Sequence, residues 1–469
     1  MIGQPPLRTH SPRRQSSSRA SRGRRLRTAS PNTWRALFVT LLGTCLIVVA
    51  MSQTVASGSS NPPNASTAEC NSIATCYSPQ QIQVAYGVTP LLARGIDGRG
   101  ETVVLPELAY PVANLPVSDL RQDMKKFDVL FGLPAAKLTF DDSLARVSQP
   151  WLANGEEVLD AEMVHTVAPG ATISIVLVAA NSLNTVSNAV TASIAAIRWG
   201  VTHGAIISIS AAGQTGGEHC DSQAQVTRLH AALQLAARRH VTVVAASGDV
   251  GSVGEPCDVI RGLIGGPFAP VEEVNLPAAD PLVLGAGGTS LSAGHATGTY
   301  ESEIGWGLPD GNPNTQFQGS GGGFSLQWPR PAYQNGVPGP GAGRGVPDVS
   351  ADASPSKAMA IVTSSGAGFT IRNSGGTSAS APIWAGIIAL ADQYAGRHLG
   401  DVNPAIYAIG RSASYHQAFH DVIKGQNAPT FAGHAITGYT ARAGWDPVTG
   451  WGSPDAQYLV PLLAHMDQG

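Results

Sequence analysis

The sequence has 469 residues, of which 43% are hydrophobic and 13% are charged, and it contains 54 Gly and 33 Pro. This composition is typical of a compact, loop-rich α/β protein and excludes a coiled coil or a largely disordered chain. The formal net charge is −3, but nine Arg fall within residues 1–35, so the remainder carries 20 basic against 32 acidic residues, a charge of −12, which argues against nucleic acid as a partner.

The N-terminal region has the pattern of an export segment. The basic residues 1–35 lead into an apolar run at 36–51, and small residues follow at 54–57. This order is typical of a signal peptide. We therefore predict that residues 1–57 are a signal peptide or a signal anchor with a long basic region. The protein is then secreted, unless residues 36–51 hold it at a membrane, and residues 58–75 are a flexible linker.

Cysteine usage agrees with export. Cys45 lies inside the apolar run and would leave with it, which leaves Cys70, Cys76, Cys220 and Cys257. An even set in an oxidising compartment predicts two disulfides. Sequence proximity favours Cys70–Cys76 with Cys220–Cys257, although the spacing is compatible with all three pairings. The lack of a Cys-x-x-Cys pair argues against a metal site.

From residue 76 onward, short buried β-type runs alternate with longer runs of helical periodicity. The expected strands are Thr102–Leu105, Thr172–Val178, Ala205–Ser210, Val241–Ala246, Leu282–Ala286 and Met359–Val362. The expected helices are Thr185–His203, Ala224–His240 and Ser380–His398. This alternation predicts an α/β fold with a mainly parallel central sheet flanked by helices. In such sheets functional groups gather beyond the carboxyl ends of the strands.

The first candidate site is a pair of carboxylates. A helical pattern begins after Asn154, which is placed to cap it. Glu156 and Asp160 are four positions apart, so both project from one face of that helix. Two carboxylates this close resist joint ionisation and share a proton, so the pair can accept a proton from a nucleophile. Glu157 and Glu162 are expected on the solvated side.

A third carboxylate ends a buried strand. Asp249 follows Val241–Ala246 in the segment Ser-Gly-Asp-Val-Gly. A protonated carboxyl group can donate a hydrogen bond, so Asp249 is a candidate for stabilising an oxyanion, provided that the site works in acid or raises its pKa. The alternative interpretation is an ordinary Asx turn.

Ser378 is the candidate nucleophile. It lies in Gly-Gly-Thr-Ser-Ala-Ser-Ala-Pro, at a glycine-rich entry to a predicted helix whose amides can help to hold an oxyanion. A serine nucleophile needs a base, and no His-Gly-Thr-His segment is present. His165 is the nearest candidate histidine, but a helix residue packed beside the sheet explains it better.

Taken together, these segments resemble the sedolisin (serine-carboxyl peptidase) family over roughly residues 76–460. The matching stretches are Gly155–Asp160, Val167–Ala171, Ala246–Gly251, Gly287–Leu291, Gly321–Ser325, Gly345–Ser350 and Gly375–Pro382. The resemblance implies a subtilisin-like fold across 76–469. It also implies that Glu156 is the general base, Asp160 its partner, Ser378 the nucleophile, Asp249 the oxyanion-stabilising acid, and Glu107 a carboxylate behind the triad.

The resemblance further implies one structural calcium ion near the C-terminus. Its ligands would be the side chains of Asp421 and Asp446 and the backbone carbonyls of Val422, Arg442 and Gly444. Carboxylate and carbonyl oxygens are the ligands that Ca²⁺ prefers.

Three features depart from the family pattern. Arg442 stands where a Gly is common, although only its carbonyl is needed. A Trp usually follows the Ser-x-Ser strand, where this chain has Ala211 and Ala212. The stretch between the export segment and the domain is also shorter than the family's usual propeptide.

The sequence thus predicts a secreted, acid-acting serine-carboxyl peptidase. It would be a monomer that cleaves polypeptides as an endopeptidase or a tripeptidyl-peptidase. Two alternatives stay open, namely a catalytically weak or inactive peptide-binding protein on the same scaffold and a neutral subtilisin-type enzyme served by His165.

Overall fold

The structure is a computed structural model that describes residues 76–109, 117–153, 155–179, 186–204, 206–210, 216–255, 257, 270–307, 318–339, 342–357, 359–365, 368–431 and 434–466. The predicted export segment, the linker, Asn154 and Ala211–Ala212 lie outside these residues. Within the described ranges, no helix is both long and apolar enough to cross a membrane.

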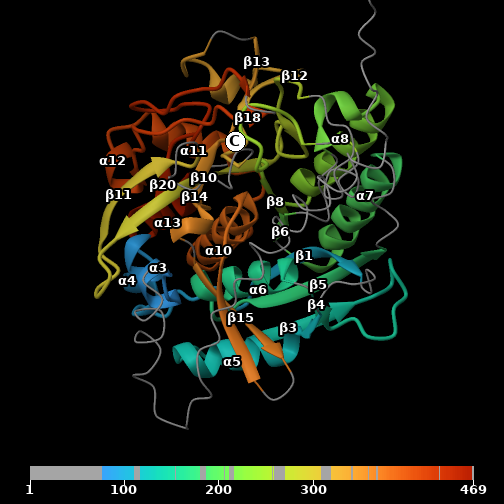
Figure 1. The fold of residues 1–469 in the computed structure, drawn as a ribbon, viewed down its shortest axis with the longest axis vertical. Coiled ribbons are helices and arrows are strands. Elements are labelled where there is room, and N and C mark those ends of the chain that lie inside the picture. The colour runs from blue at the N-terminus through green and yellow to red at the C-terminus, as the bar shows by residue number, and fades with distance from the viewer. Residues whose placement is uncertain are drawn as a thin grey trace, which may run out of the picture. The chain divides into compact units, whose positions relative to one another are not determined.

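A mainly parallel sheet forms the centre of this domain (Figure 1). Its strands are β1 (Thr102–Ala109), β3 (Lys137–Asp141), β5 (Thr172–Ala179), β6 (Ile206–Ile209), β8 (Thr242–Ala246), β10 (Leu284–Ala293), β11 (Tyr300–Gly305) and β14 (Val349–Asp352). The order is β11-β10-β8-β6-β1-β5-β3, and β14 also pairs with β10. Only the β10–β11 pair among these strands is antiparallel. The predicted α/β fold with a mainly parallel sheet is confirmed.

Helices cover both faces of the sheet. They are α3 (Pro79–Ala85), α4 (Thr89–Leu92), α5 (Leu120–Phe131), α6 (Glu156–Val167), α7 (Val186–His203), α8 (Gln223–Arg238), α10 (Thr377–Ala395), α11 (Asn403–Gly410), α12 (Tyr415–Ala418) and α13 (Ala456–His465). Side chains alternate between the faces of each strand. Val103 and Leu105 of β1 pack in the cluster that contains α6 and α10, whereas Val104 packs in the cluster that contains α7 and α8.

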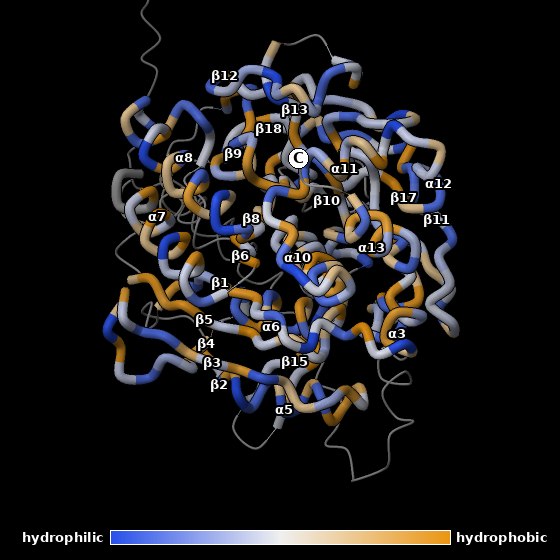
Figure 2. The backbone as a smooth tube through the Cα atoms, turned by 180° about the vertical axis from the view of Figure 1, so that it is seen from behind, coloured by the Kyte–Doolittle hydropathy of each residue, from blue (hydrophilic) through white to orange (hydrophobic). Residues whose placement is uncertain are grey.

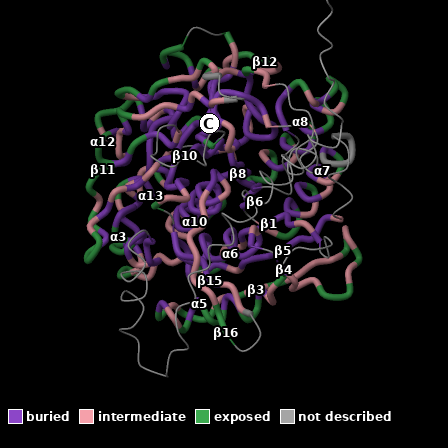
Figure 3. The backbone as a smooth tube through the Cα atoms, in the orientation of Figure 1, coloured by how far each residue is buried: buried purple, intermediate pink, exposed green. Residues whose placement is uncertain are grey.

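The hydrophobic core is densest around α10. In Figure 2 the apolar colour follows the central strands and the inner faces of the helices. In Figure 3 the buried residues are concentrated along α10, β6 and β8, whereas exposed residues gather near α5 and α12. The N-terminus of α10 therefore lies at a strongly buried part of the domain, which is where a site can exclude water.

Short ladders connect the larger elements. Their strands are β2 (Ser118–Asp119), β4 (Leu152–Ala153), β7 (Gly216–Gly217), β9 (Asn275–Leu276), β12 (Gly323–Pro329), β13 (Gly343–Val346), β17 (Phe419–His420), β18 (Thr430–Phe431), β19 (His434–Ala435) and β20 (Ser453–Pro454). Three 3₁₀ turns are η2 (Glu218–Cys220), η3 (Ala332–Gln334) and η4 (Pro355–Lys357).

Two elements differ from the sequence-based expectation. The strand expected at Met359–Val362 is β15 (Met359–Ser365), which pairs with β16 (Gly368–Ser374) in an antiparallel hairpin outside the central sheet. A short apolar run does not identify its partner strand. The helix expected at Ser380–His398 begins at Thr377 and ends at Ala395, because Gly396 takes the left-handed conformation (φ 64°) at its C-cap.

The prediction that Glu157 and Glu162 lie on a solvated side of α6 is wrong. Glu157 is 2% exposed and Glu162 is fully buried, as is every other residue from 157 to 167. The hairpin β15–β16 covers this side of the helix. The Glu162 carboxylate accepts a hydrogen bond from Val362 N (3.0 Å), and Asp123 of α5 accepts one from Ser364 N (2.5 Å). The two carboxylates therefore satisfy the outer edge of β15, a polar edge that would otherwise stay unpaired.

Candidate active site

Ser378 lies in the first turn of α10, one residue beyond the helix start, and is half-buried. The turn before it requires glycine at position 376. Gly376 has a φ of 98°, and a Cβ there would come within 2.5 Å of Asp249 Oδ2. The glycine thus lets the Asp249 carboxyl approach the N-terminus of the helix.

The predicted acid pair lies on α6. Glu156 is the first residue of the helix and is half-buried, whereas Asp160, one turn later, is fully buried. The cap is Gly155 (φ 123°), which makes no side-chain cap bond. A side chain at position 155 would collide with the guanidinium of Arg372 from β16. The hairpin that buries α6 thus also packs against the start of the helix, beside Glu156.

Asp160 is enclosed by hydrogen-bonding groups and other acids. Ser210 Oγ, just beyond β6, donates to Asp160 Oδ1 (3.0 Å). Burial raises the pKa of Asp160 well above its usual range, the Glu156 charge adds to this, and the hydrogen bonds from Ser210 and Glu107 oppose it. A hydrogen bond donated to a carboxylate favours its charged form and therefore lowers its pKa.

Glu107 is a buried carboxyl group beside the acid pair. Its side chain is 1% exposed, in β1 behind the acid pair. Burial is the main cause that raises the pKa of Glu107 well above its usual range. The charges of Asp160, Glu157 and Glu156 and a hydrogen bond with Asp160 raise it further. That shared bond raises the pKa of Glu107 and lowers the pKa of Asp160. The expected place of Glu107 behind the pair agrees with this geometry.

Asp249 approaches α10 from the other side. Its Oδ1 accepts two hydrogen bonds from Thr377, one from the backbone N (2.7 Å) and one from Oγ1 (2.8 Å). Burial raises the pKa of Asp249, and the two Thr377 bonds oppose that shift. Because both bonds fall on Oδ1, the proton of a neutral Asp249 lies on Oδ2, the oxygen that faces Gly376. A carboxyl group in this state can donate to an oxyanion beside Ser378.

A further carboxyl group, which the sequence analysis did not predict, holds the Asp249 loop in place. Asp249 N donates to Glu255 Oε1 (2.8 Å), and Glu255 N donates to Asn275 Oδ1 (2.7 Å). Asn275 Nδ2 in turn donates to Ser247 O (2.8 Å). Burial, with the charge of Asp249, raises the pKa of Glu255 to about 7. The loop is thus fixed on one side by α10 and on the other by Glu255 and Asn275.

His165 has a structural place. It is fully buried near the C-terminal end of α6, more than two turns from Glu156. Its Nε2 lies 2.9 Å from Pro134 O and 3.0 Å from Asp128 Oδ1. It is thus a packed helix residue beside the sheet, as expected, and its contacts point to α5 and the loop after it. This arrangement opposes a neutral enzyme with His165 as the base.

The two halves of the expected calcium site meet in the structure. Gly444 N donates to Asp421 Oδ1 (3.1 Å), and Arg442 N donates to Asp446 Oδ2 (3.0 Å). Asp446 is fully buried, and its carboxylate accepts three further hydrogen bonds. The donors are Val448 N, Thr449 N and Thr449 Oγ1. Two carboxylates and three backbone carbonyls form an oxygen-only donor set, which fits Ca²⁺ chemistry.

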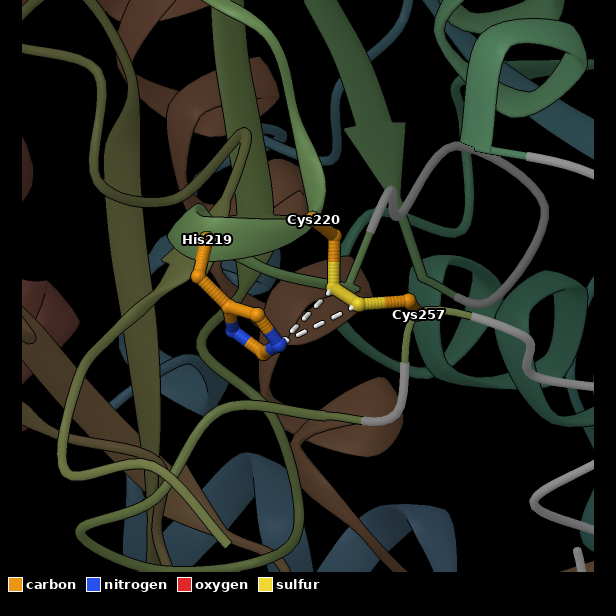
Figure 4. Close-up of side chains that lie close together, drawn as sticks. All are labelled: His219, Cys220 and Cys257. Carbon is orange, nitrogen blue, oxygen red and sulfur yellow. Dashed lines mark hydrogen bonds between the residues drawn. A yellow bond between two sulfur atoms is a disulfide. The ribbon is translucent and has the colours of Figure 1, made fainter. Parts of the chain in front are cut away.

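One group of residues with metal-ligand spacing was found in the described part of the chain, and it is a disulfide with a histidine (Figure 4). Cys220 and Cys257 are bonded to each other, which confirms that predicted pairing. His219 Nε2 lies 3.3 Å from Cys257 Sγ, and its Nδ1 bonds the buried Glu273. Sulfurs in a disulfide are not thiolate ligands. Cys76 is also disulfide-bonded, but Cys70 lies outside the described residues, so that pairing stays a prediction.

Comparison with known proteins places the chain in a family. The subtilase family matches residues 151–418. Kumamolisin of Bacillus sp. (strain MN-32) is 32% identical over 411 residues, which cover 83% of this chain and 64% of kumamolisin. A tripeptidyl-peptidase of Arthroderma otae is 33% identical over 252 residues, which cover 48% of this chain and 36% of that protein. The chain thus spans less than two thirds of the length of these relatives.

The fold is also found among solved structures. The structure of Pseudomonas sedolisin, a serine-carboxyl proteinase, aligns with a TM-score of 0.65 at 24% sequence identity, over 82% of this chain and 97% of that one. This similarity confirms the subtilisin-like α/β architecture. The chain therefore belongs to the subtilase family and is a sedolisin-type, kumamolisin-like member of it.

Proposed function

We propose that the protein is an acid-acting serine-carboxyl peptidase that hydrolyses polypeptides through an acyl-enzyme on Ser378. The observation that carries this proposal is the convergence of two carboxyl systems on the first turn of α10. Asp249 bonds the backbone N of Thr377, next to Ser378. Asp160 bonds Ser210, whose hydroxyl also lies 3.4 Å from the carbonyl oxygen of Ser378. The similarity to kumamolisin supports peptide substrates.

In the proposed first step, Glu156 takes the hydroxyl proton of Ser378 as the oxygen attacks the peptide carbonyl. The new C–O bond forms while the carbonyl π electrons move to the oxygen, and Asp249 donates a hydrogen bond to that oxyanion from Oδ2. Glu156 then gives the proton to the leaving amine as the C–N bond breaks. Water repeats the sequence on the ester, which frees the acid product and restores Ser378.

The two halves of this mechanism fix the pH range. Glu156 must be able to accept a proton, so activity falls when the acid pair becomes fully protonated. Asp249 must keep its proton, so activity falls as the pH rises through its pKa. Because burial raises that pKa, the donor form extends above the usual range of a carboxyl group but is lost at higher pH. We therefore expect a bell-shaped profile on the acid side of neutrality.

Ser378→Ala tests the nucleophile, and the chain offers a matched control. Ser380 lies two residues later in the same helix, fully buried, with an Oγ that has no hydrogen-bond partner among the described residues. We expect Ser378→Ala to lose on the order of 10⁴-fold or more in kcat, and Ser380→Ala to stay within about threefold of the unsubstituted protein. Assays of peptide cleavage from about pH 3 to 7 provide the readout. Retained cleavage in Ser378→Ala would remove the proposal.

Cleavage products separate the two modes of action. Release of three-residue fragments from the N-terminus of a peptide would identify a tripeptidyl-peptidase, as the name of the Arthroderma otae relative suggests. Internal fragments from a long peptide would identify an endopeptidase. If the protein binds peptides at Ser378 but releases neither kind of fragment, it is instead the inactive peptide-binding protein.

We further propose that Asp421, Asp446 and the carbonyls of Val422, Arg442 and Gly444 hold one structural calcium ion, which would tie the two C-terminal segments together. Ligand binding to the folded state adds about 2.7 kcal/mol at a hundredfold excess over Kd. We expect calcium to raise Tm by several degrees and Asp421→Asn to abolish that rise.

Asp401→Asn is the control for the calcium proposal, because Asp401 is an acid that bonds its own loop at Asn403 N. It should keep the full response to calcium. An equal Tm with calcium and with a chelator, in the unsubstituted protein, would contradict the calcium site.

Secretion and a monomeric state remain part of the proposal. The disulfide Cys220–Cys257 supports an oxidising compartment. N-terminal sequencing of the protein recovered from the medium would test export and locate any cleavage after residues 1–57, and sedimentation would test the monomer.

A further inference from the structure

Ser210 connects the acid pair with the nucleophile's segment. It follows β6 at the carboxyl end of the strand and is 1% exposed. Its Oγ donates to Asp160 Oδ1 at 3.0 Å and lies 3.4 Å from the carbonyl oxygen of Ser378. One hydroxyl proton serves one strong bond, and the shorter distance places it on Asp160.

We propose that Ser210 is a positioning residue of the acid pair, whose hydroxyl fixes the Asp160 carboxylate by donating a hydrogen bond to it. This inference rests on the proposed function, because it assigns a role within that same site. Ser210 does not touch the reacting atoms in the proposed mechanism. Its effect passes through Asp160.

Burial alone does not explain this contact. Ser208 is two residues earlier on β6, on the same side of the strand by alternation, and is fully buried. Its Oγ has no hydrogen-bond partner among the described residues. Ser208 in β6 and Ser210 just beyond it are both buried, but of these two hydroxyls it is that of Ser210 that reaches the Asp160 carboxylate.

The surroundings of Asp160 make this bond consequential. The titratable groups that bear on it are Glu107 from β1 and Glu156 and Glu157 from its own helix, and the charges of Glu156 and Glu157 disfavour an ionised Asp160. Neighbouring β6 and α10 contribute Ser210 and Ser378. A donated hydrogen bond stabilises the carboxylate against these acids. Without it, the negative charge of the pair forms only at higher pH.

The test compares Ser210→Ala with Ser208→Ala in the full-length protein. The readout is the pH profile of kcat/KM for a peptide substrate from about pH 2 to 7. We expect the acid limb of Ser210→Ala to move about one pH unit upward, so that kcat/KM falls about tenfold on that limb and changes little at the optimum. Ser208→Ala should reproduce the unsubstituted profile, because it removes no bond.

An acid limb that stays in place in Ser210→Ala, or that moves equally in Ser208→Ala, would overturn the inference. If Ser210→Ala does not fold, Ser210→Cys keeps the side-chain size with a weak donor and must move the limb in the same direction. Failure of the proposed function has a different signature, namely cleavage that survives Ser378→Ala whatever the serines of β6 do.

Discussion

Two groups of carboxyls flank the first turn of α10, and they are held in different ways. On the α6 side, Asp160 lies among Glu107, Glu156 and Glu157, so protons are shared within a cluster of acids. On the β8 side, the hydrogen bonds found for the Asp249 carboxyl in the described part of the chain come from the neutral groups of Thr377. In the proposed mechanism, the first arrangement serves the base and the second serves the hydrogen-bond donor. Different neighbours would thus suit similar side chains to different tasks.

Among substitutions of the carboxyl groups, the largest expected effect comes from Asp160→Asn, because it breaks the α6 cluster. The substitution removes the charge that Ser210 and Glu107 stabilise and leaves Glu156 without its partner. We expect kcat/KM to fall on the order of 10²–10⁴-fold, while circular dichroism still reports a folded domain. A loss below tenfold would mean that the acids on this side act independently.

Asp249→Asn should have the next largest effect and a different form. Asn still donates through its amide nitrogen, and its one oxygen can still accept from Thr377. Unlike Asp249, however, it does not titrate. We expect kcat to fall about 10²–10³-fold, and the alkaline limb of the pH profile to flatten because the group that loses its proton is gone. An unchanged alkaline limb would show that another residue sets it and would break the contrast between the two sides.

Glu255→Gln should have the smallest effect. It tests whether Asp249 titrates independently of Glu255. The pKa of Glu255 is raised to about 7, so Glu255 is neutral in the acid range where activity is expected. Gln keeps an oxygen for Asp249 N. We therefore expect less than about a threefold change in kcat/KM in acid. A shift of the alkaline limb by about one pH unit or more would show that Asp249 and Glu255 titrate as a coupled pair.

Local patterns were sufficient to predict the main elements of the site. The spacing of Glu156 and Asp160 predicts a shared helix face, and the position of Asp249 after a buried strand predicts the edge where it lies. The glycine-rich entry predicts a helix at Ser378, although the helix begins before that residue and not after it. The catalytic roles of these residues stay predictions.

Contacts between distant segments could not be predicted in this way. Glu162 looked solvated because helical periodicity does not reveal that β15, two hundred residues later, covers it. Ser210 is fifty residues from Asp160, and its role needs the strand order of the sheet. Glu255 lies in a loop without any periodic signal. These three depend on tertiary packing, which overrides local preference.

The most direct test of the account is the pH dependence of covalent labelling at Ser378 by a peptide aldehyde, followed by mass spectrometry from about pH 3 to 8. The account predicts labelling of Ser378 that is strongest in acid, falls toward neutral pH, and is lost in Glu156→Gln. Labelling that rises toward neutral pH and persists in Glu156→Gln would contradict a serine served by carboxyl groups.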